Sequence, residues 1–215
     1  MTISRLYFVL AVIFTPFSVT LAEPPPSTHF RSNFGFNVDL PQGWVLLGPN
    51  ETSRKVAPIT AVDLGLPKAN PRELKQYLER AKTGQVEFYL DTLLSTETFT
   101  NNISVQLENG SQDYSQYGQK EMDAFCGQLT PDLGKVWGTP VAVKGCQTSL
   151  SNRTAVLAYS YVIPARNMFV FQYEVPFDAN HTLVVVGGGR LDEEVISRVR
   201  PAVKAIVTSI TGRTK

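Results

Sequence analysis

Residues 155–186 read AVLAYSYVIPARNMFVFQYEVPFDANHTLVVV, and this stretch decides the fold class. It contains three runs rich in β-branched and aromatic residues, which favour strands, separated by short segments that carry proline, asparagine and aspartate. The three runs are Ala155–Val162, Met168–Val175 and Thr182–Val186. Because short connections join neighbouring strands that run in opposite directions, the stretch predicts an antiparallel meander.

A helical pattern follows the meander. Between Asp192 and Ile210, apolar side chains recur at helical spacing, at Val195, Val199, Val203, Ile206 and Ile210. Asp192, Glu193 and Glu194 lie in the first turn, where the helix dipole favours anions, so a structural role explains these acids without catalysis. Pro201 interrupts the pattern but leaves the apolar stripe in phase, which predicts a kinked helix, or two abutting helices, lying on the sheet.

The N-terminal half predicts further strands. Phe34–Leu40 alternates apolar with small or polar residues, the pattern of a half-buried strand, and Trp44–Leu46 resumes after a Pro-Gln-Gly turn. We expect these two pieces to be adjacent strands, with the tryptophan packed in the core. Val86–Leu90 and Ile103–Leu107 also have the composition and alternation of strands.

Two further helices are expected. Asn70, followed by proline and by Glu73, is a typical helix start, and Gly84 stops that helix. A second helix, over Tyr117–Leu129, should end before Pro131 because proline has no backbone N–H. Strands that are interrupted and followed by segregated helices predict an α+β sandwich, with a central antiparallel sheet flanked by helices.

The first 22 residues read as an export signal. Arg5 supplies a positive charge, Leu6–Phe14 is an apolar run too short to span a bilayer, and small residues precede a cleavage site between Ala22 and Glu23. The alternative is an uncleaved anchor that tethers the protein to a membrane, because further apolar residues follow the run. We therefore expect a periplasmic or secreted protein.

The rest of the chain suits one neutral domain. A proline-rich spacer occupies residues 23–29, and residues 30–212 are long and apolar enough for a single domain. The chain holds 20 Lys and Arg against 19 Asp and Glu, and removal of Arg5 with the signal leaves equal numbers. A neutral chain does not attract nucleic acid or an anionic membrane, and no stretch after residue 22 could form a transmembrane helix.

Cys126 and Cys146 are the only cysteines in the chain. In an oxidising compartment they would form a disulfide between the second helix and a strand that begins near Val141. The alternative is two separate buried thiols, since free cysteine packs as a small hydrophobe. The two cysteines do not form the Cys-x-x-Cys motif of a redox catalyst.

Few residues point to catalysis, a metal or a cofactor. The two histidines, His29 and His181, are too few for a His/Cys metal site if the cysteines are bonded, and a nucleophile relay would depend on His181 alone. We therefore expect no metal, no cofactor and no enzymatic activity. Val184–Gly189 lacks the third glycine and the following strand of a dinucleotide site, so it predicts a turn. Arg190, beside the helix start, is a candidate for holding a small anion.

Asn-x-Ser/Thr sequons stand at Asn50, Asn102, Asn109, Asn152 and Asn180. In a eukaryotic secretory route they would be candidate glycosylation sites, with Asn102 the least suitable because it opens a predicted strand. In a bacterial protein the same pattern reflects turn-rich sequence.

Several of these features together resemble the PsbP/DcrB-like family. They are Phe-x-Val-x-Leu-Pro-x-Gly-Trp at residues 36–44, a helix and strand that lead to Asn102-Ile-Ser-Val105, and the meander with its final helix. The resemblance covers most of the mature chain and implies a central antiparallel sheet flanked by helices, in an exported or lumenal protein that binds a partner and catalyses nothing. These motifs mark a fold, so the resemblance transfers no functional residue and does not choose among partners.

The sequence therefore predicts a non-enzymatic, exported envelope protein that binds a protein partner or supports an assembly. One alternative is a small-molecule carrier, which would use the concave sheet face or a pocket beneath the Leu64–Lys68 loop. Another alternative is a hydrolase, which would need a cleft with several ionisable groups of perturbed pKa.

Overall fold

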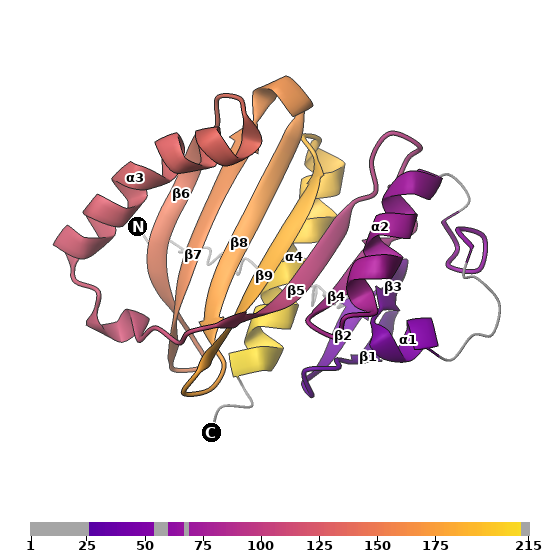
Figure 1. The fold of residues 1–215 in the computed structure, drawn as a ribbon, viewed down its shortest axis with the longest axis horizontal. Helices are drawn as coiled ribbons and strands as arrows, with labels where there is room; N and C mark the ends of the chain where they lie inside the picture. Colours follow the sequence, from indigo (N-terminus) through magenta and orange to yellow (C-terminus); the bar gives the residue numbers. More distant parts are fainter. Residues whose placement is uncertain (1–25, 54–59, 67–68, 212–215) are drawn as a thin grey trace, which may run out of the picture.

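A seven-stranded antiparallel sheet forms the centre of the described part of the chain, residues 26–53, 60–66 and 69–211 of the computed structural model (Figure 1). The strand order is β3-β4-β5-β9-β8-β7-β6. The strands are β3 (Trp44–Leu47), β4 (Val86–Asp91), β5 (Asn102–Asn109), β6 (Ala142–Ser151), β7 (Thr154–Ile163), β8 (Met168–Pro176) and β9 (His181–Arg190). Strands β6 to β9 pair consecutively, so the predicted antiparallel meander is confirmed.

Helices cover both faces of this sheet. The face toward the viewer in Figure 1 carries α2 (Pro71–Ala81) and α3 (Gln119–Trp137), whereas α4 (Glu193–Thr211) lies behind the strands. A two-stranded ribbon of β1 (Ser27–Arg31) and β2 (Asn37–Pro41) packs against α4. The remaining short elements are α1 (Pro49–Ser53) and the 3-10 helices η1 (Tyr114–Gln116) and η2 (Pro164–Arg166). The α+β fold class, with a central antiparallel sheet flanked by helices, is confirmed.

Strand β4 buries side chains on both of its faces. Its apolar residues pack with α2, and these are Val86, Phe88 and Leu90. Because side chains alternate along a strand, Glu87, Tyr89 and Asp91 point to the opposite face, where each is 0% exposed. Two carboxylates therefore enter the layer that α4 and the β1–β2 ribbon share with the sheet.

The glycines of β9 let α4 lie close to the sheet. The sequence predicted a turn over Gly187–Gly189, and that prediction is wrong, because these residues belong to the strand. A Cβ atom at Gly189 would lie 2.7 Å from Val195 Cγ1, and one at Gly187 would collide with Val203. The glycines are therefore required for close packing, since an added side chain would push the helix away.

Two helices continue through a proline. The expected end of α3 before Pro131 is wrong, because the helix runs to Trp137 and ends at Gly138, whose φ is 65°. Helix α4 likewise passes Pro201 without a break, which excludes the alternative of two abutting helices. In both helices, apolar residues beyond the proline still pack against the sheet, and this burial outweighs one lost backbone hydrogen bond.

The chain before β3 differs from the sequence prediction. Trp44 is buried as expected, but β2 and β3 are not adjacent, because β2 pairs with β1 while β3 pairs with β4. Strand β1 also includes residues 27–29, which were assigned to the spacer. Alternation predicts which face of a strand is buried but cannot identify the partner strand, and this explains both errors. The predicted signal peptide and its cleavage site at Ala22–Glu23 lie outside the described residues.

No helix in the described ranges combines the length and the apolar composition needed to cross a bilayer.

Candidate functional site

A cavity of about 420 Å³ lies at the end of the sheet where β4 and β9 end. It is lined by Leu66, Ala69, Thr92, Leu93, Leu94, Ser95, Thr96 and Arg190. Two sequence predictions therefore meet at one place, because Arg190 was the anion candidate and Leu66 belongs to the loop under which a pocket was expected. Residues 67–68 of that loop lie outside the described part of the chain.

Arg190 gives this cavity a partly compensated positive charge. Its side chain is 42% exposed, and Arg190 Nη2 lies 3.9 Å from Asp192 Oδ2. The other carboxylate oxygen, Asp192 Oδ1, accepts hydrogen bonds from the backbone N–H groups of Glu194 and Val195 at the start of α4. The predicted structural role of the acidic helix start is therefore confirmed for Asp192, which caps α4.

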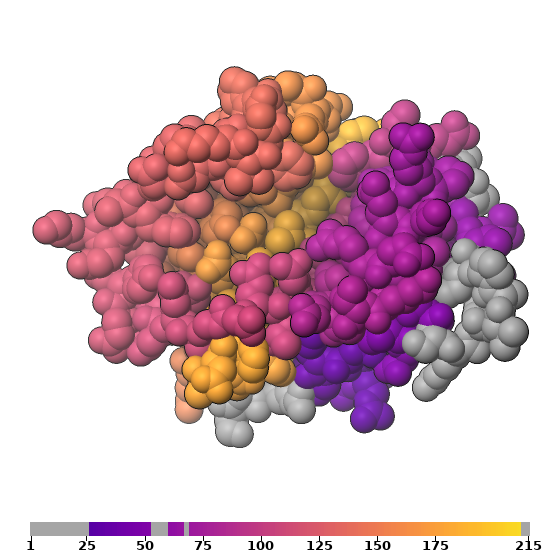
Figure 2. Space-filling model, in the orientation of Figure 1, coloured from indigo at the N-terminus to yellow at the C-terminus, as the bar shows by residue number. Residues whose placement is uncertain are grey.

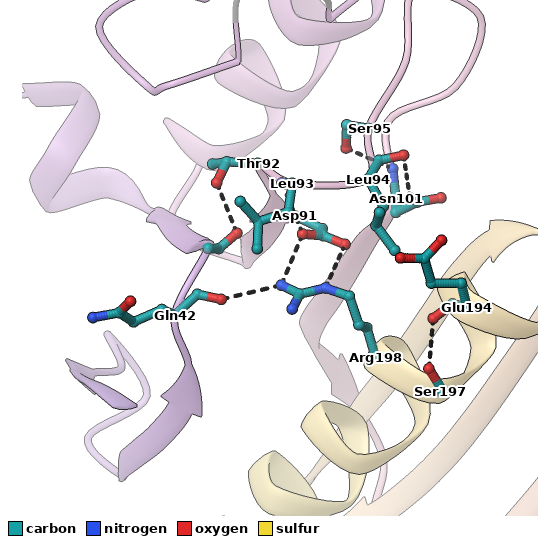
Figure 3. A network of polar contacts seen from close by, with 11 residues as sticks. Gln42, Asp91, Thr92, Leu93, Leu94, Ser95, Asn101, Glu194, Ser197 and Arg198 are labelled. Carbon is teal, nitrogen blue, oxygen red and sulfur yellow. Dashed lines mark hydrogen bonds and ion pairs between the residues drawn. The ribbon is translucent and has the colours of Figure 1, made fainter. Parts of the chain in front are cut away.

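Asn101 holds the cavity wall in place (Figure 3). It is 1% exposed, its side-chain nitrogen donates to the Leu94 carbonyl at 2.9 Å, and its backbone N–H donates to Ser95 Oγ at 3.1 Å. Its side-chain oxygen accepts the backbone N–H of Arg190 at 3.3 Å. One buried amide thus ties the β4–β5 connection to the end of β9.

Asp91, whose side chain is fully buried, forms an ion pair with the partly buried Arg198 next to this wall (Figure 3). Arg198 Nε donates to Asp91 Oδ2 at 3.1 Å, and Nη2 donates to Asp91 Oδ1 at 3.0 Å. Nη2 also donates to the Gln42 carbonyl at 3.1 Å, and the Leu93 N–H donates to Asp91 Oδ1 at 3.1 Å. The pair joins the end of β4, the β2–β3 turn and α4, and its hydrogen bonds within the protein indicate a structural role.

Leu93 is an exposed apolar side chain in the wall of the cavity. It is 62% exposed, although it belongs to a segment that is fixed on both sides. Thr92 N–H donates to the Gly43 carbonyl at 2.7 Å, and a Cβ atom at Gly43 would lie 2.5 Å from Leu93 Cγ. Gly43, with a φ of 92°, therefore leaves space for this leucine at the surface.

Glu87 is the second buried carboxylate of β4. Glu87 Oε1 accepts hydrogen bonds from Ser32 Oγ at 2.7 Å and from Tyr89 Oη at 2.9 Å. Glu87 Oε2 accepts the backbone N–H of Asn33 at 2.9 Å and its side-chain amide at 3.2 Å. Burial raises the pKa of Glu87, while these hydrogen bonds oppose the shift. The group anchors the β1–β2 loop to the main sheet.

The Glu87 carboxyl predicts a specific pH dependence. Because its folded-state pKa is raised, its contribution to stability is fully present below the ordinary value of 4.5 and is lost as the pH rises through the folded-state pKa. Compared with Glu87→Gln, the wild type should therefore lose unfolding free energy as the pH rises above the ordinary value of 4.5, measured by urea unfolding at a series of pH values. Glu97→Gln, at an exposed position, is the control. A difference from Glu87→Gln that stays constant with pH would contradict the prediction.

A hollow lies over the face of the sheet that is opposite α4 (Figure 1 and Figure 2). Figure 2 shows β8 and β9 at its base, between α3 and the segment that contains α2. Ser104, Val186 and Gln172 lie side by side across β5, β9 and β8 on this face, and all three are half-buried. Beside η1, Glu174 on β8 accepts hydrogen bonds from Tyr114 Oη at 2.6 Å and from Tyr159 Oη at 3.3 Å. Burial raises the pKa of both tyrosines, so they remain protonated donors.

Each histidine pairs with an aspartate close to it in the fold. His29 Nδ1 lies 2.9 Å from Asp39 Oδ1 in the β1–β2 ribbon, and His181 Nδ1 lies 2.9 Å from Asp178 Oδ1 in the β8–β9 turn. Within residues 26–53, 60–66 and 69–211, neither imidazole hydrogen-bonds to a hydroxyl or thiol, and no group of His, Cys, Asp and Glu side chains has the geometry of a metal site.

Cys126 and Cys146 have the spacing of a disulfide. Cys126 lies on α3 and Cys146 on the edge strand β6, and their Cα atoms are 5.8 Å apart. This separation is compatible with a disulfide, which would fasten the helix to the edge of the sheet.

The sequon asparagines have different surroundings. Asn102, which opens β5 as expected, is half-buried, and its amide donates to Tyr77 Oη and to the Thr100 carbonyl. The four other asparagines are exposed, and they are Asn50, Asn109, Asn152 and Asn180. Asn102 is therefore the least accessible of the five to a glycan.

Comparison with known proteins found a similarity to a solved structure. No family model matches the chain, and no curated protein matches it. Among solved structures, the solution structure of cyanobacterial PsbP (CyanoP) from Synechocystis sp. PCC 6803 is similar to this chain, with a TM-score of 0.46 and 9% sequence identity. The match covers 89% of this chain and 95% of that chain. Membership of the PsbP/DcrB-like family remains a prediction.

Proposed function

We propose that this protein is an exported, non-enzymatic protein that binds a protein partner or supports an assembly, and that the partner docks at the cavity beside Leu93. The observation that carries the proposal is the 62% exposure of Leu93, an apolar side chain held in the wall of a cavity by fixed backbone on both sides. Exposed apolar side chains that lie beside a pocket mark protein interaction sites, and a side chain that is already held in place loses less conformational entropy when a partner binds.

The surroundings of Leu93 define the partner's chemistry. Val62, in the loop segment that contains Leu66, and Leu191, which follows Arg190 at the end of β9, are also exposed, at 75% and 40%. Arg190 is the ionisable side chain among the described lining residues. We therefore propose a partner segment that places an apolar side chain beside a carboxylate. An arginine stays protonated and therefore cannot act as a general base, so this lining supports binding over hydrolysis.

Capture of the partner tests this function. The tagged full-length chain is crosslinked in cells and purified from the envelope fraction, in parallel with Leu93→Ser and with Leu150→Ser, which alters a leucine that is 78% exposed on β6. The partner should be recovered with the wild type and Leu150→Ser, and its yield should fall about tenfold with Leu93→Ser. Recovery of background proteins alone, or equal yields from both variants, would refute the proposal. The mass of the purified chain tests export, because a cleaved protein begins at Glu23.

A second candidate function is small-molecule carriage at the same cavity. It is favoured by the volume of about 420 Å³, which falls within the range of ordinary ligand pockets. A carrier would bind a small acid with Arg190 and would recover no protein partner. Co-purification of such an acid with the wild type, and its loss in Arg190→Gln, would favour this function over protein binding.

A further inference from the structure

Helix α4 lies across the sheet, from β9 to the β6–β7 turn. Between the helix and strands β6 and β7 there is a wedge-shaped space. Its middle lies against β9, where Gly187 faces Val199 and Val203. Its C-terminal end reaches the β6–β7 turn, where Thr211 Oγ1 lies 2.9 Å from Ser151 Oγ and Asn152 Nδ2 donates to the Thr208 carbonyl at 2.9 Å. Because α4 contacts the sheet at β9 and again at the β6–β7 turn, the position of the helix is fixed at both ends of this wedge-shaped space.

The wedge forms a groove of about 300 Å³ with a floor of small side chains. Gly145, Ser160 and Phe171 occupy one row across β6, β7 and β8, and the next row begins with Gln147 and Ala158. The glycine, serine and alanine leave open the space that larger residues would fill. Phe171 and the half-buried Tyr173 form the wall that continues toward α4.

Two cations of α4 border this groove. Arg200 and Lys204 are four positions apart, so both side chains lie on the same face of the helix, and both are exposed. The Arg200 guanidinium carbon lies 4.9 Å from the centre of the Phe171 ring, which orients the charged group over the groove. Within the described ranges neither cation forms an ion pair, and the groove lining contains no carboxylate.

The polar groups that face the same space are hydrogen-bond donors or can act as donors. Burial raises the pKa of Tyr173, so its hydroxyl stays protonated, while the nearby Arg200 charge opposes that shift. Ser160 contributes a hydroxyl, and Gln147 contributes a side-chain amide. An anion would therefore find two positive charges on the helix and neutral donors on the sheet.

We propose that this groove binds a small organic anion, whose carboxylate or phosphate head pairs with Arg200 and Lys204 and whose apolar body lies against Phe171 and the floor of small residues. The paired cations account for the charge of the ligand, and the aromatic wall accounts for its apolar part. The volume limits the ligand to a few rings or a short chain. The site lies on the face of the sheet that α4 covers, and it is separate from the cavity beside Leu93.

Titration followed by ¹⁵N–¹H NMR tests the site. Phenyl phosphate and benzoate are added to the mature protein, with benzyl alcohol as the neutral analogue and inorganic phosphate as the head group alone. At least one aromatic anion should cause saturable shifts at the amides of Gly145, Gln147 and Ser160. Benzyl alcohol and inorganic phosphate should bind at least about tenfold more weakly, because each lacks one of the two recognised parts.

Two double variants separate the groove from general charge attraction. Arg200→Gln/Lys204→Gln should weaken binding by about tenfold or more, since it removes charge-assisted hydrogen bonds. Arg72→Gln/Lys75→Gln removes the same charge from exposed positions on α2 and should leave binding unchanged. The spectra themselves report whether each variant is folded. Equal weakening in both variants, or the absence of saturable shifts up to about 10 mM of either aromatic anion, would overturn the proposal.

Discussion

Replacing Arg198 with methionine is expected to lower the free energy of unfolding by about 3–5 kcal/mol, because it leaves a buried carboxylate without its counter-ion. Asp91 is 0% exposed and receives two hydrogen bonds from this arginine. In Arg198→Met the backbone N–H of Leu93 remains as a donor to Asp91 Oδ1, and the Gln42 carbonyl also loses its donor from Nη2. Urea unfolding at neutral pH measures the change.

A double-mutant cycle shows whether the loss comes from the unpaired charge. Asp91→Asn/Arg198→Met should be more stable than Arg198→Met alone, because an uncharged amide costs less to bury than an unpaired carboxylate. Lys204→Met changes an exposed cation on the same helix and should alter stability by about 0.5 kcal/mol or less. If Arg198→Met behaved like Lys204→Met, the ion pair would not contribute to folding.

The parts of the fold that could be predicted from the sequence are those set by local pattern. The β6–β9 hairpins have short connections, so strand composition and turn residues identify both the strands and their partners. The start of α2 was also recognisable, since Asn70 accepts hydrogen bonds from the backbone N–H groups of Arg72 and Glu73. Pairing of β3 with β4 was not predictable, because a long segment with its own helices separates them.

Two errors arose where tertiary packing outweighs a local preference. The sequence of Gly187–Gly189 predicts a turn because glycine permits unusual backbone angles, yet in β9 the missing side chains make room for Val195 and Val203. Pro131 was expected to end α3, yet the helix continues because later side chains still contact the sheet. A single sequence shows the local preference but not the packing that opposes it.

The candidate site was predicted only in part. Arg190 was singled out because it lies beside a helix start, and a pocket was expected under the loop that contains Leu66, but nothing in the sequence indicated that the two meet. Leu93 and the pair of Asp91 with Arg198 were missed. The alternation of residues 86–91 could have indicated that Glu87 and Asp91 share a face, but the arginine that pairs with Asp91 lies 107 residues away along the chain.

Removal of the link between Cys126 and Cys146 is expected to lower the free energy of unfolding by about 3 kcal/mol, because the disulfide that we propose would restrict the unfolded chain over a separation of 20 residues. Alkylation of the unfolded, non-reduced protein should add no mass, whereas alkylation after reduction should modify both cysteines. Detection of two free thiols before reduction would contradict the proposed bond.

Two proteins that lack the disulfide can show whether the stabilisation comes from restriction of the unfolded chain or from packing of the sulfur atoms. Reduced wild type keeps both side chains, whereas Cys126→Ala/Cys146→Ala removes them from the half-buried contact between α3 and β6. If the constraint on the unfolded chain dominates, the two proteins should lose similar amounts of stability relative to the oxidised form. The slope of unfolding free energy against urea should also increase on reduction, because an unrestricted unfolded chain exposes more surface. Loss of stability in the alanine variant alone would instead assign the effect to packing between the helix and the edge strand.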